Sequence, residues 1–132
     1  MKLENIKDTL TASSSYLPNS NFSCCDLTGM KMNNVNLTGM KITDANLSEL
    51  FIDGAQIGGA YIKNIGMPPE GHPLHDPNNL LQKPVILENC DLNNSQIKNC
   101  NLSNIEIEGC DISGMKVNGI AIEDLLKQYK SK

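Results

Sequence analysis

The chain has 132 residues, which is enough for one domain and short for two of ordinary size. Hydrophobic residues make up 39% of it, with three Tyr, two Phe and no Trp, so we do not expect an aromatic-rich core. The net charge of −4 argues against direct binding to nucleic acid or to an anionic membrane. No apolar run approaches the roughly 18 residues of a membrane-spanning helix. The N-terminus lacks the apolar region of a secretory signal, so we expect a cytoplasmic protein.

Residues 1–16 are expected to cap the N-terminal end of the domain. They carry Leu3, Ile6 and Leu10, an apolar spacing of three to four residues. A protein built of stacked repeats exposes unpaired backbone groups at its ends and needs such a cover.

From residue 17 onward the sequence repeats with a period of five. Every fifth residue, here called the central residue of its repeat, is apolar through residue 62 and again from residue 87. The seventeen central residues are Phe22, Leu27, Met32, Leu37, Ile42, Leu47, Ile52, Ile57, Ile62, Leu87, Leu92, Ile97, Leu102, Ile107, Ile112, Val117 and Ile122. Chance does not produce such a run in a chain that is 39% apolar.

The other positions of the repeat are also specialised. Two residues before each central residue stands a small or medium-sized side chain. Two residues after it lies the corner residue, which is Gly or Asn in thirteen of seventeen repeats. Both types tolerate the positive φ that turns such as type II require. A period of five fits neither a helix nor an alternating strand, and it predicts a square coil that turns every five residues. Stacked coils of twenty residues would pair at roughly 4.8 Å.

The repeats resemble a known family. Segments such as CDLTG, VNLTG, ANLSE, CDLNN, CNLSN and CDISG are similar to the pentapeptide-repeat consensus A(D/N)LXX. The resemblance covers about residues 17–65 and 85–124. It implies an all-β fold, a right-handed quadrilateral β-helix, or solenoid, of about four to five coils that one loop interrupts.

The cysteines fit the same pattern. Cys25, Cys90, Cys100 and Cys110 each stand two residues before a central residue, so we expect them to fill a narrow core as small hydrophobic side chains. Zinc ligands usually come in close pairs, whereas these are spaced by ten or more residues. A metal or redox role stays open as an alternative. Cys24 occupies a corner.

Residues 66–84 break the repeat and carry five prolines, so they are predicted to form an inserted loop. The loop holds both histidines of the chain. Glu70, His72, His75 and Asp76 are candidates for contact with a partner, and a metal-binding loop is an alternative. No helix brings the two imidazoles together, so we predict no metal and no cofactor.

The repeats that follow the loop are acidic. On the square coil Glu88, Glu106 and Glu108 share one face, and Asp91 and Asp111 share the next. The simplest interpretation is a solvated surface that keeps the protein soluble. The same five carboxylates are candidates for contact with a protein partner.

Residues 122–132 are predicted to form a short C-terminal helix. Ile122, Leu125, Leu126 and Tyr129 have the spacing of one apolar helix face. This helix either caps the coil or docks onto a second copy. Homodimerisation is known in the family that the repeats resemble, and Leu125, Leu126 and Tyr129 would form such a contact.

No nucleophile, base and orienting group come together in the sequence, so we predict no enzyme and no catalytic residue. We expect a scaffold that binds a protein partner, either itself or an unknown bacterial protein. The resemblance implies an alternative, because some pentapeptide-repeat proteins mimic duplex DNA, bind DNA gyrase and protect it from quinolones. The acidic surface, the loop and the apolar tail are compatible with that role.

Overall fold

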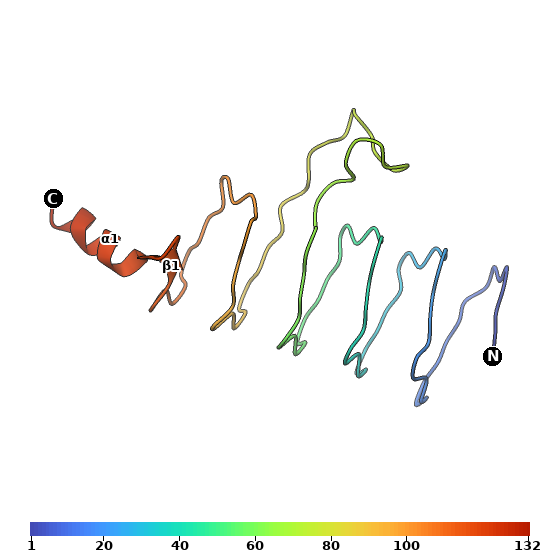
Figure 1. The fold of residues 1–132 in the computed structure, drawn as a ribbon. Helices are drawn as coiled ribbons and strands as arrows, with labels where there is room; N and C mark the ends of the chain where they lie inside the picture. The colour runs from blue at the N-terminus through green and yellow to red at the C-terminus, as the bar shows by residue number, and fades with distance from the viewer. The chain divides into compact units, whose positions relative to one another are not determined.

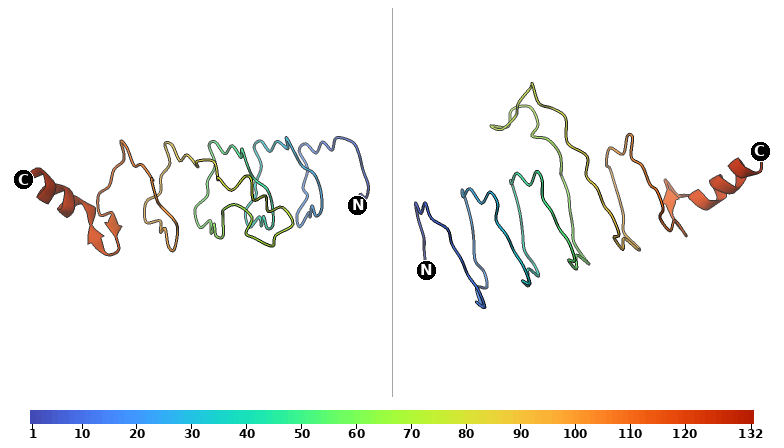
Figure 2. Two further views of the ribbon diagram at one scale, coloured as in Figure 1. Left: turned by 90° about the horizontal axis from the view of Figure 1, so that it is seen from above. Right: turned by 180° about the vertical axis from the view of Figure 1, so that it is seen from behind.

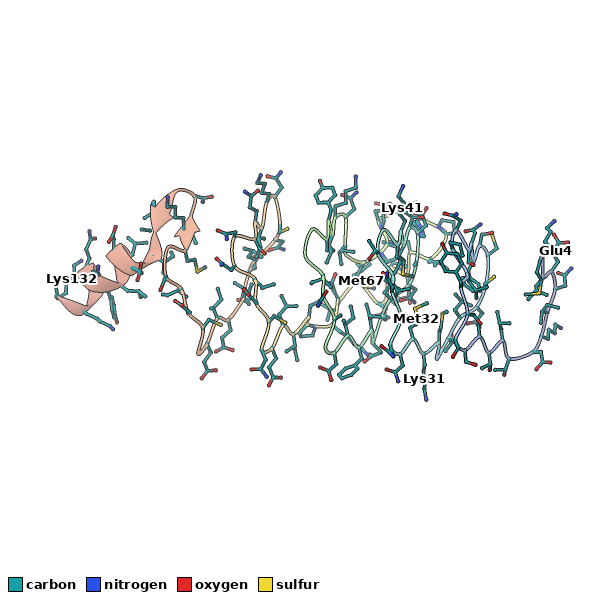
Figure 3. All side chains as sticks on the ribbon, turned by 90° about the horizontal axis from the view of Figure 1, so that it is seen from below. Glu4, Lys31, Met32, Lys41, Met67 and Lys132 are labelled. Carbon is teal, nitrogen blue, oxygen red and sulfur yellow. The ribbon has the colours of Figure 1, made fainter.

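The computed structural model describes all 132 residues, in two units, Met1–Ala60 and Tyr61–Lys132. In each unit the chain winds as a coil, with corners at both edges of every winding (Figure 1). The same winding is seen from above and from behind in Figure 2. Lys31 and Lys41, ten residues apart in the first unit, project on opposite sides of the coil (Figure 3). A coil of twenty residues predicts this arrangement.

The corners lie where the five-residue period predicts them. The corner residue has a positive φ in sixteen of the seventeen repeats, and the exception, Asp124, lies in a helix. Non-glycine corners such as Asn94 (φ 58°) and Glu49 (φ 64°) adopt the same left-handed conformation as the glycines. The prediction that this position needs a positive φ is confirmed. Ser14 and Asn19 continue the interval upstream, so corners begin inside the predicted cap, which contains no helix.

Two kinds of corner alternate along the chain. In a closed corner, the amide of the residue three positions after the central residue donates to the central carbonyl, at N···O distances of 2.9–3.1 Å. Closed corners follow Leu27, Leu37, Leu47, Ile57, Leu92, Leu102 and Ile112. The repeats between them bend without this bond and are called open corners below. A positive φ at the third residue of a four-residue turn is the signature of type II, so the closed corners are type II turns.

A side chain supports most closed corners. In six of the seven, the residue before the central one is Asp or Asn, and its Oδ1 accepts the amide hydrogen of the residue two positions later, at 2.9–3.0 Å. The six are Asp26, Asn36, Asn46, Asp91, Asn101 and Asp111. Such a bond mimics a backbone turn and fixes the local direction of the chain.

The coils do not stack in this structure, which departs from the prediction of a paired solenoid. The repeats up to Met115 contain no β-strand, and their backbone hydrogen bonds stay within single turns. No side chain is buried, and the central residues Leu27 and Ile97 are 42% and 62% exposed. The physical reason is that corners form between residues close in sequence, whereas stacking needs contacts between residues about twenty apart. A type II turn is complete within five residues, whereas a core requires a neighbouring coil at strand spacing.

The cysteines that were predicted to fill the core are consequently exposed and free. The thiols of Cys25, Cys90, Cys100 and Cys110 each donate to the carbonyl two residues earlier, at 3.2–3.3 Å. The corner residue Cys24 is also exposed.

The repeats end earlier than residue 124. Strands β1 (Lys116–Val117) and β2 (Ile120–Ala121) form an antiparallel hairpin, with Lys116 opposite Ala121 and Val117 opposite Ile120. Asn118 and Gly119 between them both have positive φ, 49° and 81°, which is the requirement of a type I′ turn. The predicted repeats centred on Val117 and Ile122 are therefore replaced by a hairpin and the start of a helix.

The predicted C-terminal helix is present as α1 (Ile122–Lys130). Glu123 and Asp124 lie in its first turn and Lys127 and Lys130 in its last, which suits the helix dipole. No helix of the chain is long and apolar enough to cross a membrane.

Candidate partner-binding surface

The inserted loop of the second unit is built from three consecutive short turns. The amide of His72 donates to the carbonyl of Pro69 at 3.0 Å, and the amide of His75 donates to the carbonyl of His72 at 2.9 Å. The amide of Asn79 donates to the carbonyl of Asp76 at 3.0 Å. The loop therefore orders its own backbone, although its prolines exclude it from a strand ladder.

The side chains of both histidines support these turns. Nδ1 of His72 accepts the amide hydrogen of Leu74 at 3.1 Å. Nδ1 of His75 lies 2.9 Å from the carbonyl oxygen of Pro68, and because a carbonyl only accepts, this nitrogen carries the proton. Pro68 and His75 are the only half-buried residues of the loop. This contact spans seven residues and ties the start of the first turn to the end of the second.

The four loop candidates do not assemble into a metal site. Nowhere in the chain do three or more His, Cys, Asp or Glu side chains gather in a way that could hold a metal ion. Oδ1 of Asp76 accepts the amide hydrogen of Asn78 at 2.9 Å, and the Nδ1 atoms of both histidines face the backbone of the loop. This geometry gives the metal-binding alternative no support, whereas Glu70 and His72 remain exposed for contact with a partner.

The five acidic candidates are all exposed, but they differ in what they do locally. Asp91 and Asp111 support closed corners through the bonds to Asn93 and Ser113. The hydroxyl of Ser113, and then its amide, lower the pKa of Asp111 below its ordinary value by stabilising the carboxylate. The sequence reasoning missed this role. The signal was present, because Asp or Asn stands before the central residue at ten-residue intervals, at 26, 36 and 46 before the loop and at 91, 101 and 111 after it.

Glu106 lines a groove in the second unit. The returning arm of the inserted loop, residues 81–85, lines the same groove. Its lining consists of Ile65, residues 81–85 and residues 101–106. The groove therefore brings the returning arm of the loop beside an acidic candidate. Glu88, Asp91, Glu108 and Asp111 do not line it.

Helix α1 presents an uncovered apolar side. Leu125 and Leu126 are 45% and 43% exposed, and Tyr129 is 79% exposed. The start of the helix is tied to the last corner. The amide of Gly114 donates to Oε2 of Glu123 at 3.3 Å, and the amide of Ile122 donates to the carbonyl of Met115 at 3.1 Å.

Comparison with known proteins gives one match. The family model described as pentapeptide repeats matches eight copies over residues 20–56 and 85–114, which is half of the chain. The match leaves out the inserted loop, and it stops before the hairpin and α1. No curated protein and no solved structure matches the chain.

Proposed function

Because the chain belongs to the pentapeptide-repeat family, we propose that it is a non-enzymatic scaffold that presents its inserted loop and neighbouring acidic side chains to a protein partner. The observation that carries this proposal is the self-supporting loop. Its turns and the contact between His75 and Pro68 hold a fixed shape outside the repeat. A preformed loop loses less conformational entropy on binding, which favours recognition of a partner.

We further propose that the working form is closed, as a right-handed quadrilateral β-helix of about four to five coils with the loop outside it. Positive φ at a fixed five-residue interval supports this proposal, since every side of a square coil needs such a corner. The central residues supply the driving force. Each Leu or Ile that becomes buried contributes about 1.5–3 kcal/mol, and the open winding leaves all of them exposed or only half-buried.

Partner capture with a loop-replaced variant tests the scaffold proposal. The wild-type protein and a variant with residues 69–80 replaced by a short Gly-Ser linker are used as bait, and captured proteins are then titrated in purified form by calorimetry. A Gln128→Ala variant serves as the control, because Gln128 lies on α1, far from the inserted loop in the sequence. We expect a partner that binds the wild type and the control and is lost with the loop. Equal affinity for the loop-replaced variant would exclude the loop as the contact.

The alternative function is a DNA mimic that binds DNA gyrase. The observation that favours it is the exposure of Glu88, Glu106 and Glu108, which the closed coil would place on one face. Duplex DNA presents one negative charge per roughly 1.7 Å of axis. Glu106 and Glu108 would both belong to one coil, which is roughly 4.8 Å high, so the local charge density would be of a similar order. A gyrase supercoiling assay with and without a quinolone tests it. No protection at saturating protein would rule out the mimic and leave the scaffold standing.

A further inference from the structure

The inserted loop changes the phase of the corner alternation. Before the loop, closed corners follow central residues 27, 37, 47 and 57, and after it they follow 92, 102 and 112. Both series have a spacing of ten, but the second is displaced by five residues from a continuation of the first. The five-residue period itself is not displaced, because residues 62 and 87 are both central residues.

The displacement limits how many sides of a square coil the loop can contain. In a coil of twenty residues, closed and open corners alternate around the four sides, so residues stacked one coil apart belong to the same kind of side. The repeats centred on Ile62 and Leu87 are both open, since neither has the bond of a closed corner. An odd number of sides, one or three, must therefore lie between them. The twenty residues 65–84 would supply four sides if all of them belonged to the coil, so at least five of them lie outside it. The five prolines of residues 66–84 favour a single side, because proline cannot donate to a strand ladder.

Two residues of the segment have the right phase to be the centre of that side, Met67 and Gln82. Met67 is apolar, as every other central residue is, and it follows a regular corner at Asn64, where φ is 55°. Gln82 is polar, and its side would have to turn directly into the side of Leu87 at Pro84, whose ring fixes φ near −65° and cannot supply the positive φ of a corner. The corner position after Met67 is also a proline, Pro69, but there the chain leaves the coil for the loop and needs no corner. The apolar side chain and the regular corner before it favour Met67.

We propose that residues 65–67 complete one side of the coil in the second unit, with Met67 stacked against Leu102, and that the inserted loop proper is residues 68–84. From that side the chain passes to the sides centred on Leu87, Leu92 and Ile97 and returns at Leu102. The base of the loop supports this assignment. A Cβ atom at Gly66 would lie 3.7 Å from Oε1 of Gln82, so the outgoing and returning arms are neighbours.

This inference rests on the closed coil of the proposed function and deepens it by locating the contact surface. A loop that leaves after Met67 returns onto the side centred on Leu87, which carries Glu88. One coil later the same side is centred on Ile107 and carries Glu106 and Glu108. The loop and these three carboxylates would therefore form one continuous surface. Asp91 and Asp111 would lie on the next side and serve mainly as corner supports.

Cross-linking of engineered cysteine pairs tests the assignment. Four native cysteines, Cys25, Cys90, Cys100 and Cys110, are first replaced by Ala, which already occupies their position in the repeats at Ala45, Ala55 and Ala60. The corner residue Cys24 is replaced by Asn, the corner residue at Asn34. Disulfide formation requires Cα atoms within roughly 7 Å, and stacked coils bring equivalent residues to roughly 4.8 Å. G66C/N101C places both thiols one residue before Met67 and Leu102. Gly66 has no positive φ, and an added Cβ meets only an ordinary contact, so the substitution is tolerated.

We expect an intramolecular disulfide in G66C/N101C, detected by mass spectrometry of the intact and digested chain. G66C/D91C, with the second thiol on the opposite side of the coil, is the matched negative control. A disulfide in L81C/N101C instead would overturn the assignment in favour of Gln82. A disulfide in Y61C/I86C would overturn it in favour of a segment between residues 62 and 87 that supplies three sides of the coil.

A second pair separates this inference from the closed coil itself. E88C/E108C joins two positions twenty residues apart, both after the loop. If this pair forms a disulfide and G66C/N101C does not, the placement of Met67 is wrong and the closed coil stands. If E88C/E108C also fails, both proposals are overturned.

Discussion

At the scale of single residues, the corner is the feature that the sequence encodes most directly. A corner needs a positive φ at one position, and in most of the closed kind an Asp or Asn oxygen three residues earlier supports it. Asn94 supplies the first and Asp91 the second in one repeat. Both requirements are local, so the residue types in the printed sequence were sufficient to predict the position and conformation of the corners. The support of closed corners by Asp and Asn was missed, because it recurs every ten residues and is not visible when all repeats are aligned at five.

The conformation of Asn94 makes a first prediction. Asn94→Val forces a β-branched side chain into the left-handed region at φ 58°, and we expect a loss of stability of about 1–2 kcal/mol. Asn94→Gly should be close to neutral because glycine adopts this conformation without strain. Thermal unfolding followed by circular dichroism measures both. Asn93→Val, one residue away and outside the left-handed region, is the control. Equal unfolding temperatures for the Val and Gly variants at position 94 would contradict the account.

The carboxylates of Asp26 and Asp111 make a second prediction. Hydrogen bonds from the hydroxyls of Thr28 and Ser113, and then from their amides, lower the pKa of each group from the ordinary value of 3.8. A lowered pKa in the folded state means that the stabilisation is fully present above pH 3.8 and is lost as the pH falls through the folded value. We expect Asp111→Asn to lower the unfolding midpoint at pH 7, where the carboxylate contributes its full stabilisation, and we expect the difference from wild type to vanish as the pH falls below 3.8. An acid dependence identical to that of wild type would show that this corner does not carry the effect.

At the scale of elements, the sequence predicted α1 and missed the hairpin before it. The helix follows from one apolar face and from charges placed to suit the dipole. The pair Asn118–Gly119 satisfies two patterns at once, since Gly119 is a corner of the five-residue period and Asn-Gly is a strong signal for a two-residue hairpin. The hairpin forms because it closes with local antiparallel bonds. The hydrogen bonds inside the inserted loop were likewise beyond sequence reasoning, because no period runs through its prolines.

The apolar side of α1 makes a third prediction. If α1 covers the end of a closed coil, Leu126→Lys removes an apolar contact and should lower stability by about 1–3 kcal/mol without changing the mass in solution. Gln128→Lys, on the polar side, should have little effect. Thermal unfolding and light scattering measure the two properties. A wild-type dimer that becomes monomeric in Leu126→Lys would contradict the cap and establish the homodimer that the apolar spacing also allows.

At the scale of the whole molecule, the corners are local features, whereas a core requires contacts between coils. The sequence predicts which side chains point inward, because the central residues are apolar without exception. It could not predict the open winding of each unit, since stacking depends on contacts between residues twenty apart. The candidate contact surface was likewise predictable only in part. Glu88, Glu106 and Glu108 could be selected from charge and period, whereas the shape of the loop that accompanies them comes from the bonds of His72 and His75.

Amide hydrogen exchange tests the closed coil most directly. In the open winding the backbone bonds of the repeats after the loop are those of the closed corners, donated by Ser95, Ile105 and Met115. A stacked coil adds ladder bonds that protect amides along every side. We predict slow exchange at amides throughout residues 87–112, including the sides with open corners. In the open winding the amides of Asn93, Ser103 and Ser113 also donate, to side-chain oxygens. Protection confined to these six amides, with free exchange at all the others, would contradict the account.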